Sequence, residues 1–159
     1  MDRLRQFAAA PLILLTLTLT EPASIAQTDE QSRAIKAVME TFERALSTRD
    51  IGMLDQIWAH EPYVMVVSPR DKSFSIGWDA VRSHWAEVFE FWSYLNVSLE
   101  TEPHIRIREG MAWASSVARA GGQTKAGEPL FFSTLMTDVF ENREGRWYMV
   151  AHHASRMPE

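Results

Sequence analysis

The spacing of apolar residues changes along this chain, and that change restricts the fold more than any other feature. In the first half, Ile35, Val38, Met39, Phe42 and Leu46 recur at helical spacing and form one apolar stripe. The second half alternates apolar and polar residues, as strands do. Helices followed by a run of antiparallel strands predict an α+β domain, in which three N-terminal helices pack on one face of a curved, mostly antiparallel sheet.

Local signals place the three helices. Thr28, with Gln31 three residues later, has the form of a capping box at the start of the first helix. Asp50 is suited to cap a short second helix, and Gly77 precedes a third helix. The second helix carries Leu54, Ile57 and Trp58, and one face of the third helix carries Val81, Trp85, Val88, Phe89 and Trp92. Between these helices, residues 63–67 are rich in strand-forming side chains.

The strands of the second half are separated by turn signals. Residues 104–108 alternate and end at Glu109-Gly110, after which residues 111–120 form the next predicted strand. The glycines between residues 121 and 127 indicate a loop. Residues 130–141 and 146–155 then predict two long strands, joined by a hairpin turn over residues 142–145.

The N-terminal segment has the layout of an export signal. A weakly basic start is followed by an apolar run from Phe7 to Leu19, and Ser24-Ile25-Ala26 places small residues before a cut. We therefore expect residues 1–26 to be a cleaved signal peptide and residues 27–159 to be one secreted or periplasmic domain. The alternative is an uncleaved anchor, although the run is short for a membrane span. After cleavage we expect no stable membrane span.

Composition excludes several classes of function. The chain has no cysteine, so it has no disulfide framework, thiol nucleophile or thiolate metal site. Its formal net charge is −5, which argues against binding to nucleic acid. It shows no Gly-rich phosphate loop, no serine in a nucleophile elbow and no short-spaced cluster of metal ligands. We expect neither a cofactor nor a metal.

Three parts of the sequence together resemble a known family. They are Asp50 at the second helix, Gly77-Trp78-Asp79-Ala80-Val81 at the third, and a C-terminal stretch that runs from Thr137 through Gly145-Arg146-Trp147 to Ser155. This pattern is similar to the nuclear transport factor 2-like superfamily, in its SnoaL-like and kinase-association-domain-like branches. The resemblance implies a cone-shaped fold with a pocket between helices and sheet, and a homodimer formed through the outer face of the sheet. It does not imply one reaction.

Three polar side chains are candidate acid–base groups. Relatives often carry His-x-His where this chain has Ala151-His152-His153, so His153 alone lies in the expected register. Neighbouring histidines on a strand point to opposite faces, which argues against a metal pair. His153 is either a general base or a structural histidine; Asp138 faces either the pocket or a dimer contact. Tyr63 offers a hydroxyl that could polarise a carbonyl.

Aromatic residues dominate the candidates for the pocket lining. The chain has six tryptophans, most of which are expected in the core. The resemblance makes some aromatics candidate ligand contacts that favour a flat, mostly apolar molecule: Trp58, Trp85, Phe89, Trp92 and Trp113. Arg119 either binds a carboxylate in the pocket or is a solvated residue at the end of a strand.

Two functions fit these features. The first is binding of a small, mostly apolar molecule, with or without cofactor-independent acid–base catalysis of the isomerase, dehydratase or cyclase type. The second is a non-catalytic homodimerisation or ligand-binding module of the cell envelope. The first loses its catalytic part if none of His153, Asp138 and Tyr63 reaches the pocket.

Overall fold

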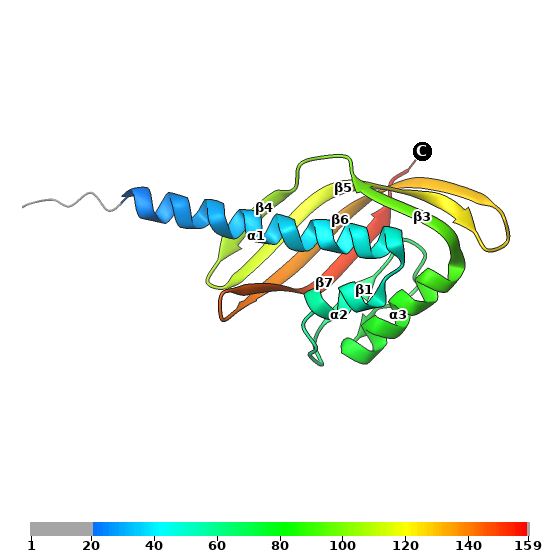
Figure 1. The fold of residues 1–159 in the computed structure, drawn as a ribbon, viewed down its shortest axis with the longest axis horizontal. Helices are drawn as coiled ribbons and strands as arrows, with labels where there is room; N and C mark the ends of the chain where they lie inside the picture. The colour runs from blue at the N-terminus through cyan, green and yellow to red at the C-terminus, as the bar shows by residue number, and fades with distance from the viewer. Residues whose placement is uncertain (1–20, 159) are drawn as a thin grey trace, which may run out of the picture.

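The computed structural model describes the chain from residue 21 to residue 158, and three helices in this range pack on a seven-stranded sheet (Figure 1). The helices are α1 (Glu21–Thr48), α2 (Ile51–Ile57) and α3 (Trp78–Phe91). The strands are β1 (Met65–Val67), β2 (Ser75–Ile76), β3 (Trp92–Leu99), β4 (His104–Arg108), β5 (Met111–Thr124), β6 (Pro129–Arg143) and β7 (Arg146–Arg156). The predicted α+β class and helix-on-sheet architecture are confirmed.

Most of the expected signal peptide lies outside the described residues. Helix α1 begins at Glu21, so the expected cleavage site falls within it and the prediction that Thr28 begins the first helix is wrong. Pro22 is compatible with this earlier start because a helix tolerates proline in its first turn. Among residues 21–158, no helix combines the length and the hydropathy needed to cross a membrane.

The starts of α2 and α3 follow from local chemistry, as the sequence predicts. The Asp50 side chain caps α2 by accepting hydrogen bonds from the backbone N–H groups of Gly52 (2.8 Å) and Met53 (3.2 Å). Gly77 precedes α3 with a φ of 88°, a conformation that favours glycine. Its N–H donates to the Val64 carbonyl at 2.8 Å, which ties the start of α3 to β1.

The strands form one mixed sheet in the order β2-β1-β7-β6-β5-β3, with β4 also paired to β5. All strand pairs are antiparallel except β1 with β7, which run parallel. Strand β5 continues to Thr124, so the loop predicted around Gly121 and Gly122 is wrong. These glycines instead allow β3 to approach closely, because a Cβ on Gly122 would lie 2.0 Å from the Tyr94 carbonyl oxygen.

An irregularity in the β6–β7 pairing decides which side chains of β7 face the helices. Phe140 pairs with Met149 but Val139 pairs with Ala151, which leaves Val150 as an extra residue on β7. Before this bulge, Trp147 and Met149 are buried; after it, His152 and Ala154 are buried and His153 is exposed. The inward positions therefore change from odd to even numbers within one strand.

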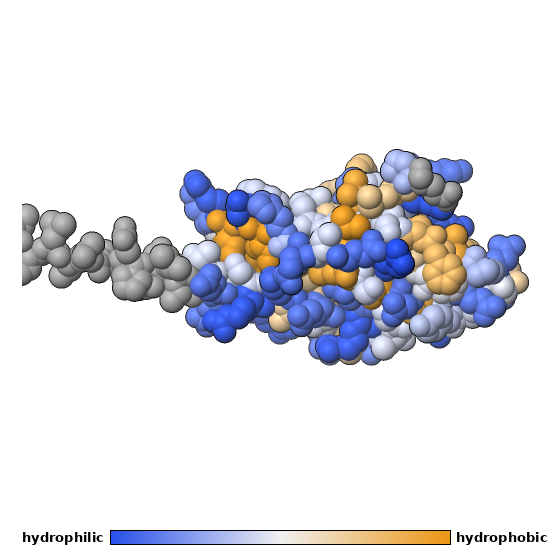
Figure 2. Space-filling view, turned by 90° about the horizontal axis from the view of Figure 1, so that it is seen from above, coloured by the Kyte–Doolittle hydropathy of each residue, from blue (hydrophilic) through white to orange (hydrophobic). Residues whose placement is uncertain are grey.

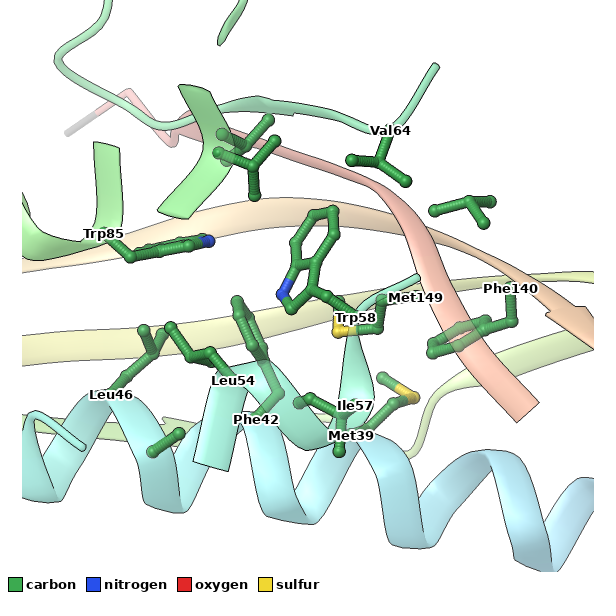
Figure 3. Packing of buried hydrophobic residues seen from close by; sticks show 14 of the residues in the cluster. Met39, Phe42, Leu46, Leu54, Ile57, Trp58, Val64, Trp85, Phe140 and Met149 are labelled. Carbon is green, nitrogen blue, oxygen red and sulfur yellow. The ribbon is translucent and has the colours of Figure 1, made fainter. Parts of the chain in front are cut away.

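The core lies between the helices and the inner face of the sheet. Figure 3 shows Met39, Phe42 and Leu46 pointing from α1 toward the sheet, where they meet Leu54, Ile57 and Trp58. This confirms the apolar stripe predicted for the first helix. Seen from above (Figure 2), the surface is mostly hydrophilic, with apolar patches set among polar residues.

Candidate functional site

A pocket of about 330 Å³ opens between the helices and the inner face of the sheet. Its wall is mostly apolar, and its polar groups come from the loop after β1, from α3, from β6 and from β7. The apolar lining residues are Leu46, Trp85, Val88, Phe91, Trp92, Leu95, Val97, Ala120, Phe132, Met136 and Ala154. Few polar groups in an apolar concave wall are typical of small-molecule sites.

His152 and Asp138 form a buried pair in the wall of this pocket. The two residues are directly opposite each other in the β6–β7 register, which brings their side chains together. His152 Nδ1 lies 2.7 Å from Asp138 Oδ1, and the residues are only 3% and 1% exposed. His152 lines the pocket itself, while Asp138 lies behind it. An aspartate in this position fixes the orientation and tautomer of the imidazole.

Aromatic rings hold His152 in place. Its ring centroid lies 4.9 Å from that of Phe42 on α1 and 5.6 Å from that of Trp85 on α3. The indole N–H groups of Trp58 and Trp85 are buried without a hydrogen-bond partner in the described part of the chain. The imidazole is thus enclosed by apolar groups, which strengthens its interaction with Asp138.

A second polar group, the Ser68–His84–Asp71 cluster, lines the same pocket. Ser68 Oγ is 2.8 Å from His84 Nε2, and Asp71 Oδ2 is 3.6 Å from His84 Nδ1. Burial lowers the pKa of His84, and the positive charge that His152 can carry lowers it further; Asp71 and Glu87 oppose this shift. His84 is therefore neutral at neutral pH.

Charged residues from the β1–β2 loop and α3 complete the lining. Arg70 and Glu87 both contribute to the pocket wall. The Arg70 guanidinium lies 3.9 Å from the centroid of the Phe91 ring, a cation–π contact. This contact links the β1–β2 loop to the end of α3.

The structure brings together only some of the residues that the sequence singled out. Trp85 and Trp92 line the pocket. Asp138 faces inward, on the same side of β6 as Phe132 and Met136, and contacts His152, but it is not itself part of the pocket lining. Trp58 and Phe89 are buried in the core and are not part of the pocket lining.

The other four candidates are not part of this pocket lining. Of the two alternatives that the sequence left open for Arg119, the solvated one matches the structure. His153 is exposed because the bulge at Val150 turns it to the outer face of the sheet. Trp113 and Arg119 share the outer face of β5, and Arg119 pairs with Glu100 at 2.9 Å. The Tyr63 hydroxyl donates to Glu141 at 2.6 Å and accepts from Arg143 at 2.7 Å, in an exposed network.

Sequence reasoning missed His152 and the Ser68–His84–Asp71 cluster. A signal for His84 was present, since it adjoins Trp85 on the predicted inner face of the third helix. Ser68 and Asp71 gave no local signal, because a turn between strands commonly contains these residue types. Within residues 21–158, no group of three or more His, Asp or Glu side chains is arranged to hold a metal ion.

Known proteins resemble this chain in sequence and in structure. A family model for the SnoaL-like domain matches residues 35–159. The F-box protein SKIP8 of Arabidopsis thaliana is 30% identical over 126 residues, which are 79% of this chain but only 51% of that protein. The chain thus spans about half the length of this relative.

Two solved structures illustrate the similarity of fold. A nuclear transport factor 2-like superfamily protein from Salmonella enterica superposes with a TM-score of 0.77 at 15% identity, covering 83% of this chain and 94% of that one. The hexachlorocyclohexane dehydrochlorinase LinA-type3 from Novosphingobium barchaimii gives a TM-score of 0.73 at 12% identity, covering 85% and 91%. At these identities the likeness extends to the fold alone.

Proposed function

We propose that this chain, which belongs to the SnoaL-like domain family and has a nuclear transport factor 2-like fold, binds a small, mostly apolar molecule and catalyses a proton transfer on it. The observation that carries the proposal is the His152–Asp138 pair, joined at 2.7 Å in the wall of an apolar pocket. Cofactor-independent reactions of the isomerase, dehydratase or cyclase type use such a group to move a proton. A structural neighbour that is a dehydrochlorinase is compatible with this class.

In the proposed mechanism, His152 is the general base and Asp138 positions it. Asp138 accepts the Nδ1–H of His152, which leaves the Nε2 lone pair as the proton acceptor. The positive charge that His152 gains is balanced by the buried carboxylate. Because apolar rings surround the pair, little water competes for the proton.

The pocket also restricts the substrate. A volume of about 330 Å³ suits a molecule of one or two rings, and Trp85 and Trp92 offer flat apolar surfaces. Polar groups of the substrate are expected to face the Ser68–His84–Asp71 cluster and Arg70, since these supply most of the polar lining outside His152.

The test uses 5-nitrobenzisoxazole, a flat apolar compound whose ring opens when a base removes one proton. We expect the protein to accelerate this reaction, with saturation, and His152→Gln to lower the rate on the order of 10²-fold or more. Asp138→Asn is expected to lower it as well, because it removes the group that orients the imidazole.

The neighbouring histidine provides the matched control. His153→Gln changes the same residue type on the outer face of the same strand, so it should leave the rate unchanged. Equal rates for wild type and folded His152→Gln protein would contradict the catalytic part of the proposal. Binding would then be judged by whether a non-reactive aromatic ligand quenches the pocket tryptophans.

A homodimer is a second candidate function, favoured by the outer face of the sheet. Large apolar side chains are exposed there on β5 and β6: Trp113 is 43%, Leu135 51% and Phe131 66% exposed. A monomeric soluble protein seldom leaves several such residues on one face without a role. We propose that a second copy of this chain covers them.

Export is a further proposal that rests on the sequence of residues 1–26. The buried residues described on α1 begin at Ile35, beyond the expected cut after residue 26. Cleavage would therefore shorten α1 without removing any of these core contacts. N-terminal sequencing of exported protein tests the proposal, and a mature chain that retains residues 1–26 would contradict it.

A further inference from the structure

The Ser68–His84–Asp71 cluster has the order of contacts found in nucleophilic hydrolases. A serine hydroxyl meets one imidazole nitrogen at 2.8 Å, and a carboxylate faces the other nitrogen at 3.6 Å. All three residues line the pocket, and the general-base mechanism above assigns none of them a chemical step. This geometry can be recognised even though the sequence contains no nucleophile elbow.

The fold holds the cluster firmly in the pocket wall. Ser68 follows directly after β1, which pairs with β7 beside His152. The Ser68 N–H donates to Asp71 Oδ2 at 2.6 Å, and the Asp71 N–H donates to the Ser68 carbonyl at 3.0 Å. These two bonds fix the Asp71 carboxylate relative to the backbone of Ser68. His84, buried on α3, lies between the Ser68 hydroxyl and this carboxylate.

We propose that Ser68 is a nucleophile that accepts the acyl group of a small apolar ester, with His84 as its base and Asp71 as the residue that positions His84. The acyl chain would occupy the apolar part of the pocket, next to Trp92 and Phe132. This activity is distinct from the proton transfer assigned to His152, although both use the same cavity.

The burial of His84 suits it to act as the base for Ser68. Burial lowers its pKa, so the ring is neutral at neutral pH and Nε2 can take the serine proton. The 3.6 Å separation from Asp71 exceeds a hydrogen bond, and such contacts often tighten only when substrate is bound.

Ser68 Oγ attacks the ester carbonyl carbon while its proton passes to His84 Nε2. The carbon–oxygen bond to the leaving alcohol then breaks, and His84 returns the proton to that alcohol, which leaves an acyl-serine. Water, deprotonated by His84, then attacks the acyl carbon. The bond from that carbon to Ser68 Oγ breaks, His84 returns the proton to Oγ, and the acyl group leaves as a carboxylic acid.

Stabilisation of the carbonyl oxygen is the weak part of this site. The Ser68 N–H is already donated to Asp71, so it is not available to the developing oxyanion. The Arg70 guanidinium lines the same pocket and is the cation that can serve there. We therefore expect acylation to be slow and the acyl-serine to accumulate rather than turn over rapidly.

The test is covalent labelling of the whole protein with a fluorophosphonate and with p-nitrophenyl butyrate, followed by intact-mass measurement and peptide mapping. We expect one added group, located at Ser68. Ser68→Ala should abolish labelling, and His84→Gln should slow it on the order of 10²-fold or more. Ser73→Ala, an exposed serine in the same loop, is the matched control and should label as wild type does.

His152→Gln separates this inference from the proposed function. It should lower the rate of 5-nitrobenzisoxazole ring opening on the order of 10²-fold or more, while an adduct still forms at Ser68. Absence of an adduct on Ser68, or an adduct at equal rate in folded His84→Gln protein, would overturn the inference whatever the result with 5-nitrobenzisoxazole. If His84→Gln does not fold, Asp71→Asn replaces it as the test variant. We expect Asp71→Asn to slow the labelling of Ser68, and an unchanged labelling rate would count against the proposal.

Discussion

At the scale of single residues, the site depends on which of two adjacent histidines faces inward. Regular alternation from the inward Trp147 and Met149 would place His153 in the pocket, but the extra residue Val150 places His152 there instead. No residue type in this stretch marks a bulge, so the sequence pattern alone could not distinguish the two. The sequence likewise could not decide whether Asp138 on β6 faces inward or outward, and the structure shows it buried on the inner face.

The first prediction concerns the cost of breaking the His152–Asp138 pair. Asp138→Ala should lower the free energy of unfolding by about 1–3 kcal/mol, because it leaves the buried imidazole N–H of His152 without its acceptor. Urea unfolding followed by tryptophan fluorescence measures this change. Thr137→Ala, next to it on the exposed face of β6, should cost less than about 0.5 kcal/mol. Equal effects of the two substitutions would contradict the buried pairing.

The second prediction concerns the dependence of stability on pH at His84. Burial lowers the pKa of His84 in the folded state, so the unfolded chain binds more protons at this residue than the folded chain does. Stability should therefore fall as the pH drops below the ordinary histidine range of about 6.5 and approaches the folded pKa.

Thermal unfolding between about pH 5 and pH 7.5 checks this sign. His84→Gln should show a smaller loss of melting temperature on acidification than wild type. His60→Gln is the comparison, since His60 is exposed at the end of α2. The prediction fails if His84→Gln loses as much stability as wild type over this pH range.

At the scale of elements, the starts of α2 and α3 were predictable, whereas the start of α1 and the end of β5 were not. Asp50 and Gly77 act through their own side chain or backbone conformation, so one residue is enough to place α2 and α3. Strand β5 instead continues through two glycines because β3 lies directly against them. That contact joins segments far apart in the sequence, and no local pattern contains it.

The third prediction compares these two glycines. Gly122→Ala should lower the free energy of unfolding by about 1–3 kcal/mol, because its Cβ would meet the Tyr94 carbonyl oxygen at 2.0 Å and backbone must move. A Cβ on Gly121 would meet the Phe131 ring, but Phe131 is exposed and its side chain can turn away. Gly121→Ala should therefore cost less.

Urea unfolding of both glycine variants tests this order. A reversed order, with Gly121→Ala the more damaging, would mean that β3 does not approach β5 as closely as the structure has it.

At the scale of the whole molecule, the change from helical to alternating spacing was enough to predict the α+β architecture and the helices on one face. It could not predict the pocket, because a cavity depends on how α3, the β1–β2 loop and the inner face of the sheet meet in space. The two polar groups in that cavity are also assembled from distant segments: β6 with β7, and the β1–β2 loop with α3.

The last prediction concerns the outer face of the sheet. If a second copy covers Trp113, Leu135 and Phe131, the protein sediments as a dimer, and a stable interface of this kind buries about 1,200–2,000 Å² in total. Trp113→Lys and Leu135→Lys each place a charge on that face. Each should raise the dissociation constant on the order of 10-fold or more, because the lysine ammonium loses water on association without gaining a partner.

Sedimentation velocity over a range of concentrations measures the effect. Ile76→Lys is the matched control, because Ile76 is also an exposed apolar residue but lies on β2 at the opposite end of the strand order. It should leave the dimer intact. A wild-type protein that stays monomeric at all concentrations would contradict the proposed dimer. A dimer that survives both lysine substitutions would place the interface on another face. The proposed pocket chemistry does not depend on either result.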